Sequence, residues 1–164
     1  MYTTEAIDHE LMQELEQQEA TYWGEYYRNV PPEIMNELGV DFLRVAEVSA
    51  GVAANIDILA FNRVIGFGMQ SVTENQSDEI IDFYKDTGAR CFFVQLSPAA
   101  KPDNLPELLQ SKGLEYYNNW VKWFREIEPL SVPDSKLPIE QIGEENVDTF
   151  AEILTTAFDW PEAL

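Results

Sequence analysis

The sequence contains one cysteine, Cys91, and one histidine, His9, whose side chains could act as a nucleophile or as an acid–base group. A nucleophilic site needs such a group next to a base that activates it. Cys91 lies inside an unbroken apolar run, residues 91–96, which is typical of a buried strand, so it is interpreted as a small core residue. His9 falls on a helix expected at the surface. We therefore predict no Cys–His or Ser–His pair, no metal site and no nominated catalytic residue. Any chemistry would depend on carboxylates, tyrosines or backbone amides.

Two glycines follow a basic residue in the segment RVIGFG, residues 63–68. Glycine amides next to a helix N-terminus can hold a phosphate group. That site requires the helix to begin directly after the last glycine, whereas the first credible capping residue is Thr73. We favour the interpretation that residues 63–69 form a strand whose glycines allow a bulge or a close backbone approach. The alternative is a phosphate-binding loop.

The elements that must position these residues begin with two helices and two strands. Near the N-terminus, acidic residues lie opposite or beside apolar residues at helical spacing, as in a helix with one solvated face. Pro31 and Pro32 start a short helix that Gly39 ends. Strands are expected at residues 42–48 and 52–59, because the small residues 49–51 between them indicate a turn.

From residue 62 onward the pattern alternates strand, helix, strand, helix, strand. Residues 73–76, TENQ, are a capping-box sequence, and Gly88 ends the helix that they open. The run at 91–96 predicts a strand covered on both faces. The predicted elements are a strand at 62–69, a helix from 73 to about 86, a strand at 91–96, a helix at 105–112 and an aromatic strand at 117–124.

This order resembles that of the GNAT-fold N-acetyltransferases, over about residues 5–126. The resemblance implies an α/β (α+β) fold with a GNAT-like, mixed, mostly antiparallel central sheet flanked by helices. It also implies acetyl-CoA as the cofactor, since residues 63–68 match the family's Gln/Arg-x-x-Gly-x-Gly/Ala loop. In the family, two parallel strands diverge to receive the pantetheine arm of CoA. At the equivalent strand ends, the candidate cofactor-binding residues are Phe67, Gly68, Met69, Leu96 and Ser97.

The family's general acid is a tyrosine in a Tyr-x-x-x-Gly-Phe ending. Here Gly113 and Leu114 take the Gly-Phe positions, which places Leu109 where the tyrosine should be. Leucine cannot donate a proton. Tyr116 and Tyr117 follow the helix and are interpreted as packing residues of the aromatic strand. The resemblance therefore predicts that this chain does not catalyse acetyl transfer by itself.

The last part of the chain predicts a second module. Residues 1–127 are interpreted as the GNAT-like domain, 128–138 as a proline-punctuated linker, and 139–164 as the strand–helix start of a second, truncated GNAT-like module. A helix at 145–158 carries Phe150, Leu154 and Phe158 on one apolar face, which we expect to be covered. The pattern suggests the N-terminal part of a tandem-GNAT protein. The alternative is a self-contained protein whose last helix docks on its own sheet.

The formal net charge of −20 limits the partners. Nucleic acids and anionic membranes need clustered basic residues, so both are excluded, whereas a small amine substrate is electrostatically favoured. No apolar run is long enough for a membrane span and the N-terminus lacks a basic start, so we expect a cytoplasmic protein.

Two hypotheses for function follow. In the first, the parent protein transfers an acetyl group from acetyl-CoA to an amine, and this chain is its non-catalytic N-terminal half. In the second, the chain is a binding or interaction module on a degenerate acyltransferase fold. The partner is then a second copy of the chain or a second GNAT module.

Overall fold

The computed structural model of the chain describes residues 8–123 and 141–161. In the described residues the sheet has the strand order β1-β2-β3-β4. The strands are β1 (Val40–Val45), β2 (Val48–Ala53), β3 (Arg63–Phe67) and β4 (Phe93–Leu96). β2 pairs antiparallel with β1 and β3, and β3 pairs parallel with β4. The predicted α/β (α+β) class, with a mixed, mostly antiparallel sheet flanked by helices, is confirmed.

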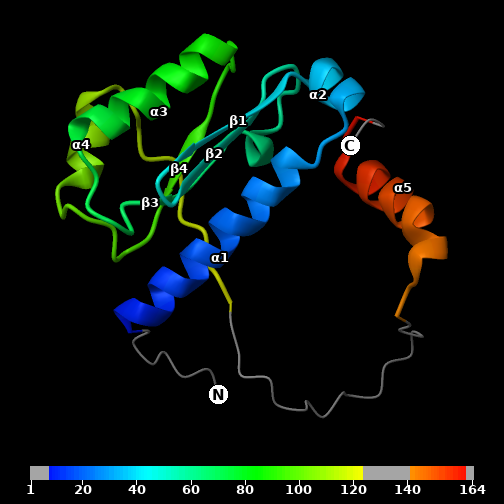
Figure 1. Cartoon of the computed structure of the whole chain (residues 1–164), viewed down its shortest axis with the longest axis horizontal. Helices are drawn as coiled ribbons and strands as arrows, with labels where there is room; N and C mark the ends of the chain where they lie inside the picture. Colours follow the sequence, from blue (N-terminus) through cyan, green and yellow to red (C-terminus); the bar gives the residue numbers. More distant parts are fainter. Residues whose placement is uncertain (1–7, 124–140, 162–164) are drawn as a thin grey trace. The chain divides into compact units, whose positions relative to one another are not determined.

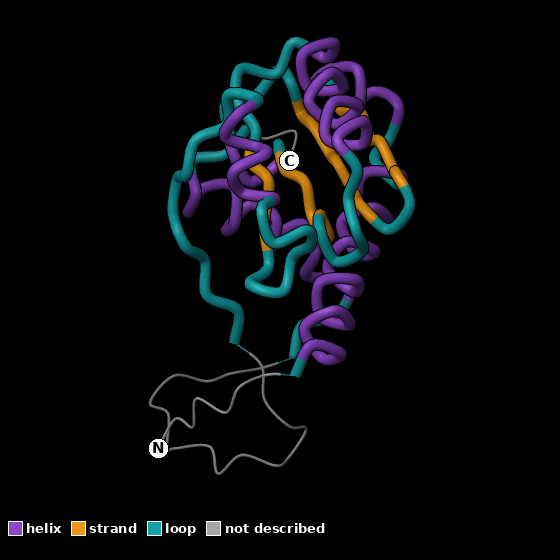
Figure 2. Tube along the Cα trace, turned by 90° about the vertical axis from the view of Figure 1, so that its left-hand side faces the viewer, coloured by secondary structure: helices purple, strands orange, loops and turns teal. Residues whose placement is uncertain are grey.

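Helices cover both faces of this sheet. The α-helices are α1 (His9–Arg28), α2 (Pro32–Leu38), α3 (Glu74–Thr87), α4 (Leu105–Ser111) and α5 (Val147–Phe158). Two 3-10 turns are η1 (Leu59–Phe61) and η2 (Glu144–Asn146). α1 lies across one face of the sheet, and α3 and α4 lie on the other (Figures 1 and 2). Among the described helices, none is both long and apolar enough to cross a membrane.

The chain divides into two compact units between Tyr116 and Tyr117. The first unit contains the whole sheet, and the described part of the second contains η2 and α5. The predicted linker at 128–138 lies outside the described residues, as do Phe124 and the first residues of the predicted second module.

The predicted helix boundaries around β3 are confirmed. Thr73 caps α3, and its hydroxyl and amide form a reciprocal capping box with Gln76. Gly88 ends α3 in the left-handed conformation, with φ of 74°. Gly39 ends α2 in the same way, with φ of 64°. Glycine is favoured at both positions because a Cβ strains a positive φ.

The predicted turn at residues 49–51 is wrong. The chain turns earlier, between β1 and β2, where Ala46 adopts a φ of 52°. Residues 49–51 instead lie within β2, directly under α1. The Ser49 hydroxyl donates to the Ala20 carbonyl at 2.6 Å, and the Tyr27 ring covers Gly51. These residues are small because a helix approaches the sheet closely, not because the chain reverses.

The opposite face of the sheet carries the apolar core. Side chains from β2, β3, α3 and α4 form one buried cluster, which contains Val48, Ala50, Val52, Val64, Phe67, Ile80, Tyr84, Leu105 and Leu109. The Tyr84 ring stacks on Phe92 with ring centroids 4.0 Å apart. The side chains of β2 therefore alternate between a close contact with α1 and this cluster, as the period of a strand requires.

The predicted burial of residues 91–96 on both faces is also wrong. Cys91 is exposed, and it precedes the strand. β4 begins only at Phe93, and its residues are half-buried. β4 is the outermost strand of the described sheet, so one side of its backbone faces away from β3. An apolar run therefore does not by itself distinguish a central strand from an edge strand.

The predicted aromatic strand is not present in the described residues that it covers, 117–123. These residues form no helix or strand, and Tyr117, Trp120 and Trp123 are largely exposed. The predicted helix at the end of the chain is confirmed as α5, but its predicted burial is wrong. Phe150 is 50% exposed and Phe158 is 61% exposed, while Leu154 is half-buried. In the described part of the second unit, the short η2 is the only other helix or strand beside α5.

Candidate functional site

The five candidate cofactor-binding residues lie at or just beyond the carboxyl ends of β3 and β4. Because these strands are parallel, both ends fall on the same edge of the sheet, and Phe67 pairs with Leu96. Phe67, Met69 and Ser97 are buried and Leu96 is half-buried. The structure thus brings the five predicted residues together, and Phe67, Met69 and Ser97 are directed into the protein interior.

The space beyond the two strand ends is filled by the chain itself. The Lys101 amide donates to the Gly68 carbonyl at 2.6 Å. A Cβ added at Gly68 would lie 2.7 Å from Leu105 Cδ2 and 2.8 Å from Ala100 Cβ. Gly68 has a φ of 84°, so both its backbone angle and its crowded surroundings favour glycine. The segment that follows β4 thus fills the space beyond the ends of β3 and β4.

Gly66 has a different role, because it lies at an irregularity in the ladder. The β3–β4 register shifts between Val64 and Phe67, and Gly66 has a φ of 81°. A Cβ at Gly66 would approach the Glu47 carbonyl at 3.1 Å and Ala20 at 3.4 Å. The glycines thus serve a bulge and close backbone approaches, and α3 begins only after Thr73. The strand predicted at residues 63–69 is confirmed over 63–67, because β3 ends at Phe67.

Arg63, the basic residue of the matching pattern, is buried under α1. Its guanidinium lies 4.1 Å from the centre of the Trp23 ring and 3.7 Å from a Glu19 carboxylate oxygen. Burial lowers the pKa of Arg63, and the nearby Glu19 carboxylate opposes that shift. Arg63 therefore links α1 to the sheet through cation–π and ionic contacts. It lies at the start of β3, at the opposite end of the strand from Gly68.

Two buried tyrosines also hold the layers of the fold together. The Tyr27 hydroxyl donates to the Phe61 carbonyl at 2.8 Å, and the Tyr84 hydroxyl donates to the Gly51 carbonyl at 2.8 Å. Burial raises the pKa of both phenols, and nearby Arg63 partly opposes the shift. Each phenol stays protonated and donates a hydrogen bond to a backbone carbonyl. This role is structural and does not require the phenol to act as a general acid.

The raised pKa values of Tyr27 and Tyr84 imply loss of stability in alkali. An unfolded tyrosine ionises near its ordinary value of 10.0, while the folded state keeps the proton. The stabilisation is thus complete below about pH 10 and decreases as the pH rises above it. Urea unfolding from pH 7 to 11 should show this decrease. The double variant Tyr27→Phe and Tyr84→Phe should lose about 1 kcal/mol per hydrogen bond at pH 7 and show a weaker alkaline decrease. Tyr116→Phe, at an exposed position, is the control; a decrease unchanged in the double variant would contradict this assignment.

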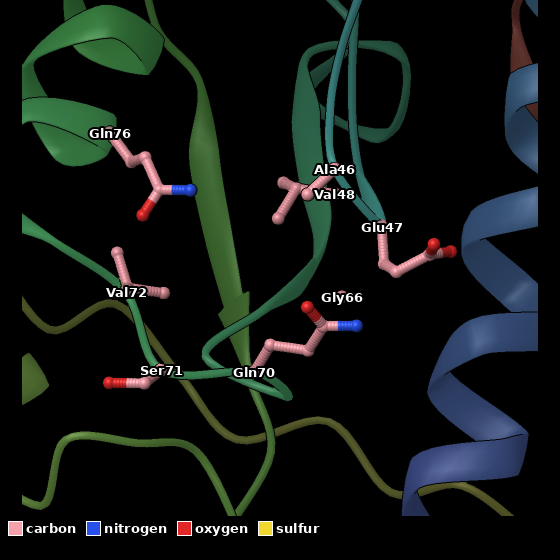
Figure 3. Close-up of a pocket in the computed structure, with 8 residues that line it drawn as sticks. All are labelled: Ala46, Glu47, Val48, Gly66, Gln70, Ser71, Val72 and Gln76. Carbon is pink, nitrogen blue, oxygen red and sulfur yellow. The ribbon is translucent and has the colours of Figure 1, made fainter.

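A small pocket lies beside β3, on the side of the β1–β2 turn (Figure 3). Its lining residues are Ala46, Glu47, Val48, Gly66, Gln70, Ser71, Val72 and Gln76. The amide ends of Gln70 and Gln76 approach it from opposite sides, while the Glu47 carboxylate turns toward α1. There Glu47 accepts from Gln17 at 2.6 Å and pairs with Arg44 at 3.3 Å. Gln76 Oε1 already accepts from the Thr73 amide and hydroxyl at 2.9 Å each, and the lining residues include no acid–base pair.

Among the described residues, neither the ends of β3 and β4 nor the pocket brings together an acid–base or a nucleophile–base pair. Leu109, which the sequence pattern placed where a catalytic tyrosine was sought, is buried in the apolar cluster. Tyr116 and Tyr117 are both 71% exposed. Within residues 8–123 and 141–161, no cluster of His, Cys, Asp and Glu could hold a metal ion.

Sequence reasoning missed the interactions of Arg63 and the residues of the pocket. The spacing of Glu19 and Trp23, one helical turn apart, was a usable signal, because it places an acid and an aromatic ring on one helix face. Nothing in the local sequence indicates that β3 supplies the arginine between them. Gln70 and Ser71 gave no signal either.

Comparisons with protein-family models, with curated proteins and with solved structures find no match for this chain. The function must therefore be argued from the geometry of the chain itself.

Proposed function

We propose that this chain is a binding or interaction module on an acetyltransferase-like fold and does not transfer acetyl groups by itself. The single observation that carries the proposal is the closed end of the β3–β4 pair. There the Lys101 amide bonds to the Gly68 carbonyl, and Leu105 and Ala100 pack against Gly68. A cofactor entering between these strands would have to break this hydrogen bond and displace a buried leucine.

The polar groups of this region also support the proposal, because they already bond to other parts of the chain. The Ala100 amide already donates to the Ser97 carbonyl at 3.0 Å, so two neighbouring amides that could face a cofactor are engaged. Arg63 contacts Trp23 and Glu19 under α1. Exposed large apolar side chains of the described residues lie elsewhere, on α1, in residues 116–123, at Ile142 and along α5. Exposed apolar groups of this extent are typical of interaction surfaces.

Titration with CoA and acetyl-CoA by calorimetry tests the proposal. We expect no heat of binding at ligand concentrations up to about 1 mM, which corresponds to a binding free energy weaker than about −4 kcal/mol. An active N-acetyltransferase in the same buffer is the positive control. A dissociation constant in the micromolar range would overturn the proposal and restore the enzyme hypothesis.

Acetyl transfer by a larger parent protein is the second candidate, with this chain as its N-terminal half. The observation that favours it is the parallel β3–α3–β4 unit, with a register shift between Val64 and Phe67. In the family that the order of elements resembles, such a strand pair receives acetyl-CoA. The test is acetyl-CoA turnover with small amines by the product of the full reading frame. Turnover that persists when residues 1–116 are replaced by an unrelated domain would show that this half does not contribute.

A further inference from the structure

Residues 141–161 carry negative charge and no positive charge. They contain no Lys or Arg, and their acidic residues are Glu144, Glu145, Asp148, Glu152 and Asp159. Among the described residues, none of these carboxylates takes part in an ion pair. Asp148 and Glu152 lie one turn apart on the same side of α5, and Asp159 ends the helix with no basic residue in its last turn. A negative charge at a helix C-terminus is unfavourable, so a cation brought there is stabilised.

The same helix has a continuous apolar face. Val147, Phe150, Leu154 and Phe158 recur at the spacing of helical turns, and Ile153 lies next to them. Val147, Phe150, Ile153 and Phe158 are each at least 50% exposed. A helix of 12 residues is only marginally stable in water unless such a face packs against something. The face therefore fits a partner that supplies apolar contacts.

The cations of the first unit are already paired. In residues 8–116 every Lys and Arg has a carboxylate oxygen of the same unit within 3.8 Å, namely Arg28, Arg44, Arg63, Lys85, Arg90, Lys101 and Lys112. A contact between these side chains and the carboxylates of α5 would have to take a cation from an existing pair. A second copy of the chain has the same pairs and a formal charge of −20, so it is repelled. The complementary partner must bring its own cations.

We propose that the apolar face of α5 binds a cationic amphipathic helix of another protein. The apolar stripe of the partner covers Phe150 and its neighbours, and its Lys and Arg side chains reach Asp148, Glu152 and Asp159. This inference rests on the proposed function, that of a binding or interaction module, and names the chemistry of the partner.

Fluorescence anisotropy with the full chain and a labelled synthetic peptide tests the proposal. The probe is a peptide of about 18 residues of Leu and Lys, in which the Leu residues form one helical stripe. A scrambled peptide of the same composition has the same charge and no stripe. We expect a dissociation constant of about 10 μM for the striped peptide, and one at least about tenfold higher for the scrambled peptide. Equal dissociation constants would show that charge alone holds the peptide, which overturns the proposal.

Phe150→Ala tests the apolar part of the contact. Binding of the striped peptide should weaken about tenfold, because the ring is 50% exposed and the partner covers that half. Thr156→Ala, on the polar side of the same helix, is the matched control and should leave the dissociation constant within about twofold. An unchanged affinity of Phe150→Ala for the striped peptide contradicts the proposal.

Removal of charge tests the acidic part of the contact. The double variant Asp148→Asn and Glu152→Gln should weaken binding about fivefold, and NaCl at about 500 mM should reduce this difference. The double variant Glu107→Gln and Glu115→Gln removes the same charge from exposed positions of the first unit and is the matched control. If the control weakens binding as much, the peptide is not held at α5 and the proposal fails.

Urea unfolding of Phe150→Ala distinguishes a face open to a partner from one that the chain covers by itself. We expect the same unfolding midpoint as in the native chain at every protein concentration. A lower midpoint that does not depend on concentration would mean that the chain's own first unit covers α5. A midpoint difference that grows with concentration would mean that a second copy covers it, and either result overturns the proposal. None of these measurements involves CoA, so the proposed function is tested separately by the calorimetric titration.

Discussion

Replacing Gly51 with valine is expected to destabilise the fold by about 3 kcal/mol or more. A Cβ built at Gly51 would overlap the ring of Tyr27. This ring cannot move aside easily, because its hydroxyl is bonded to the Phe61 carbonyl and it stacks on Phe42 with centroids 5.9 Å apart. The variant must therefore expel the ring and leave a buried carbonyl without its donor, or move α1 away from β2. Chemical denaturation of both proteins measures the difference.

Gly88→Ala measures the other reason for which a glycine can be required, a positive φ. Gly88 has a φ of 74°, but a Cβ there would meet nothing within 4 Å. Its replacement therefore tests backbone strain without crowding, and a loss of about 1 to 2 kcal/mol is expected. The double variant Gly51→Val and Tyr27→Val tests whether the Tyr27 ring causes the crowding at Gly51. If the two changes add without a coupling energy, the ring is not what excludes a side chain at position 51.

Elements whose ends are marked by local chemistry could be predicted from the sequence. The limits of α2 and α3 follow from Gly39, Thr73 and Gly88, because caps act within one turn of the helix. The delayed start of α3 also predicted a strand at residues 63–69, and β3 occupies 63–67. These features need no information about the rest of the fold.

Features that depend on a distant element could not be predicted in the same way. Residues 49–51 resemble a turn, but their small size serves the approach of α1, which is remote in the sequence. β4 resembles a central strand, although it lies at the edge of the described sheet. The candidate site also combines a feature that local sequence predicts with one that depends on a distant element. The pattern located the ends of β3 and β4, but only the structure brings Lys101 and Leu105 against Gly68.

Leu105→Ala is expected to lower the free energy of unfolding by about 2 to 5 kcal/mol. Leu105 is fully buried in the core cluster and lies against Gly68, so its truncation leaves a cavity beside the ends of β3 and β4. Leu109→Ala is the matched control, since Leu109 lies one turn further along α4 in the same cluster. Both variants should lose stability by similar amounts in urea unfolding. A loss below about 1 kcal/mol for Leu105→Ala would contradict its placement in the core.

A second measurement tests whether Leu105, besides filling the core, holds the segment after β4 against the end of β3. The Lys101 amide is hydrogen-bonded to Gly68, and Leu105 packs on the same glycine, so Leu105→Ala should speed hydrogen exchange at Lys101 more than Leu109→Ala does. Equal exchange in the two variants would mean that Leu105 does not hold the segment against β3. We expect no gain of acetyl-CoA affinity in either variant. The cavity would be lined by Gly68 and Ala100, and Arg63 would still lie under α1, against Trp23 and Glu19. Micromolar binding by Leu105→Ala alone would identify this leucine as the group that occupies the cofactor's place.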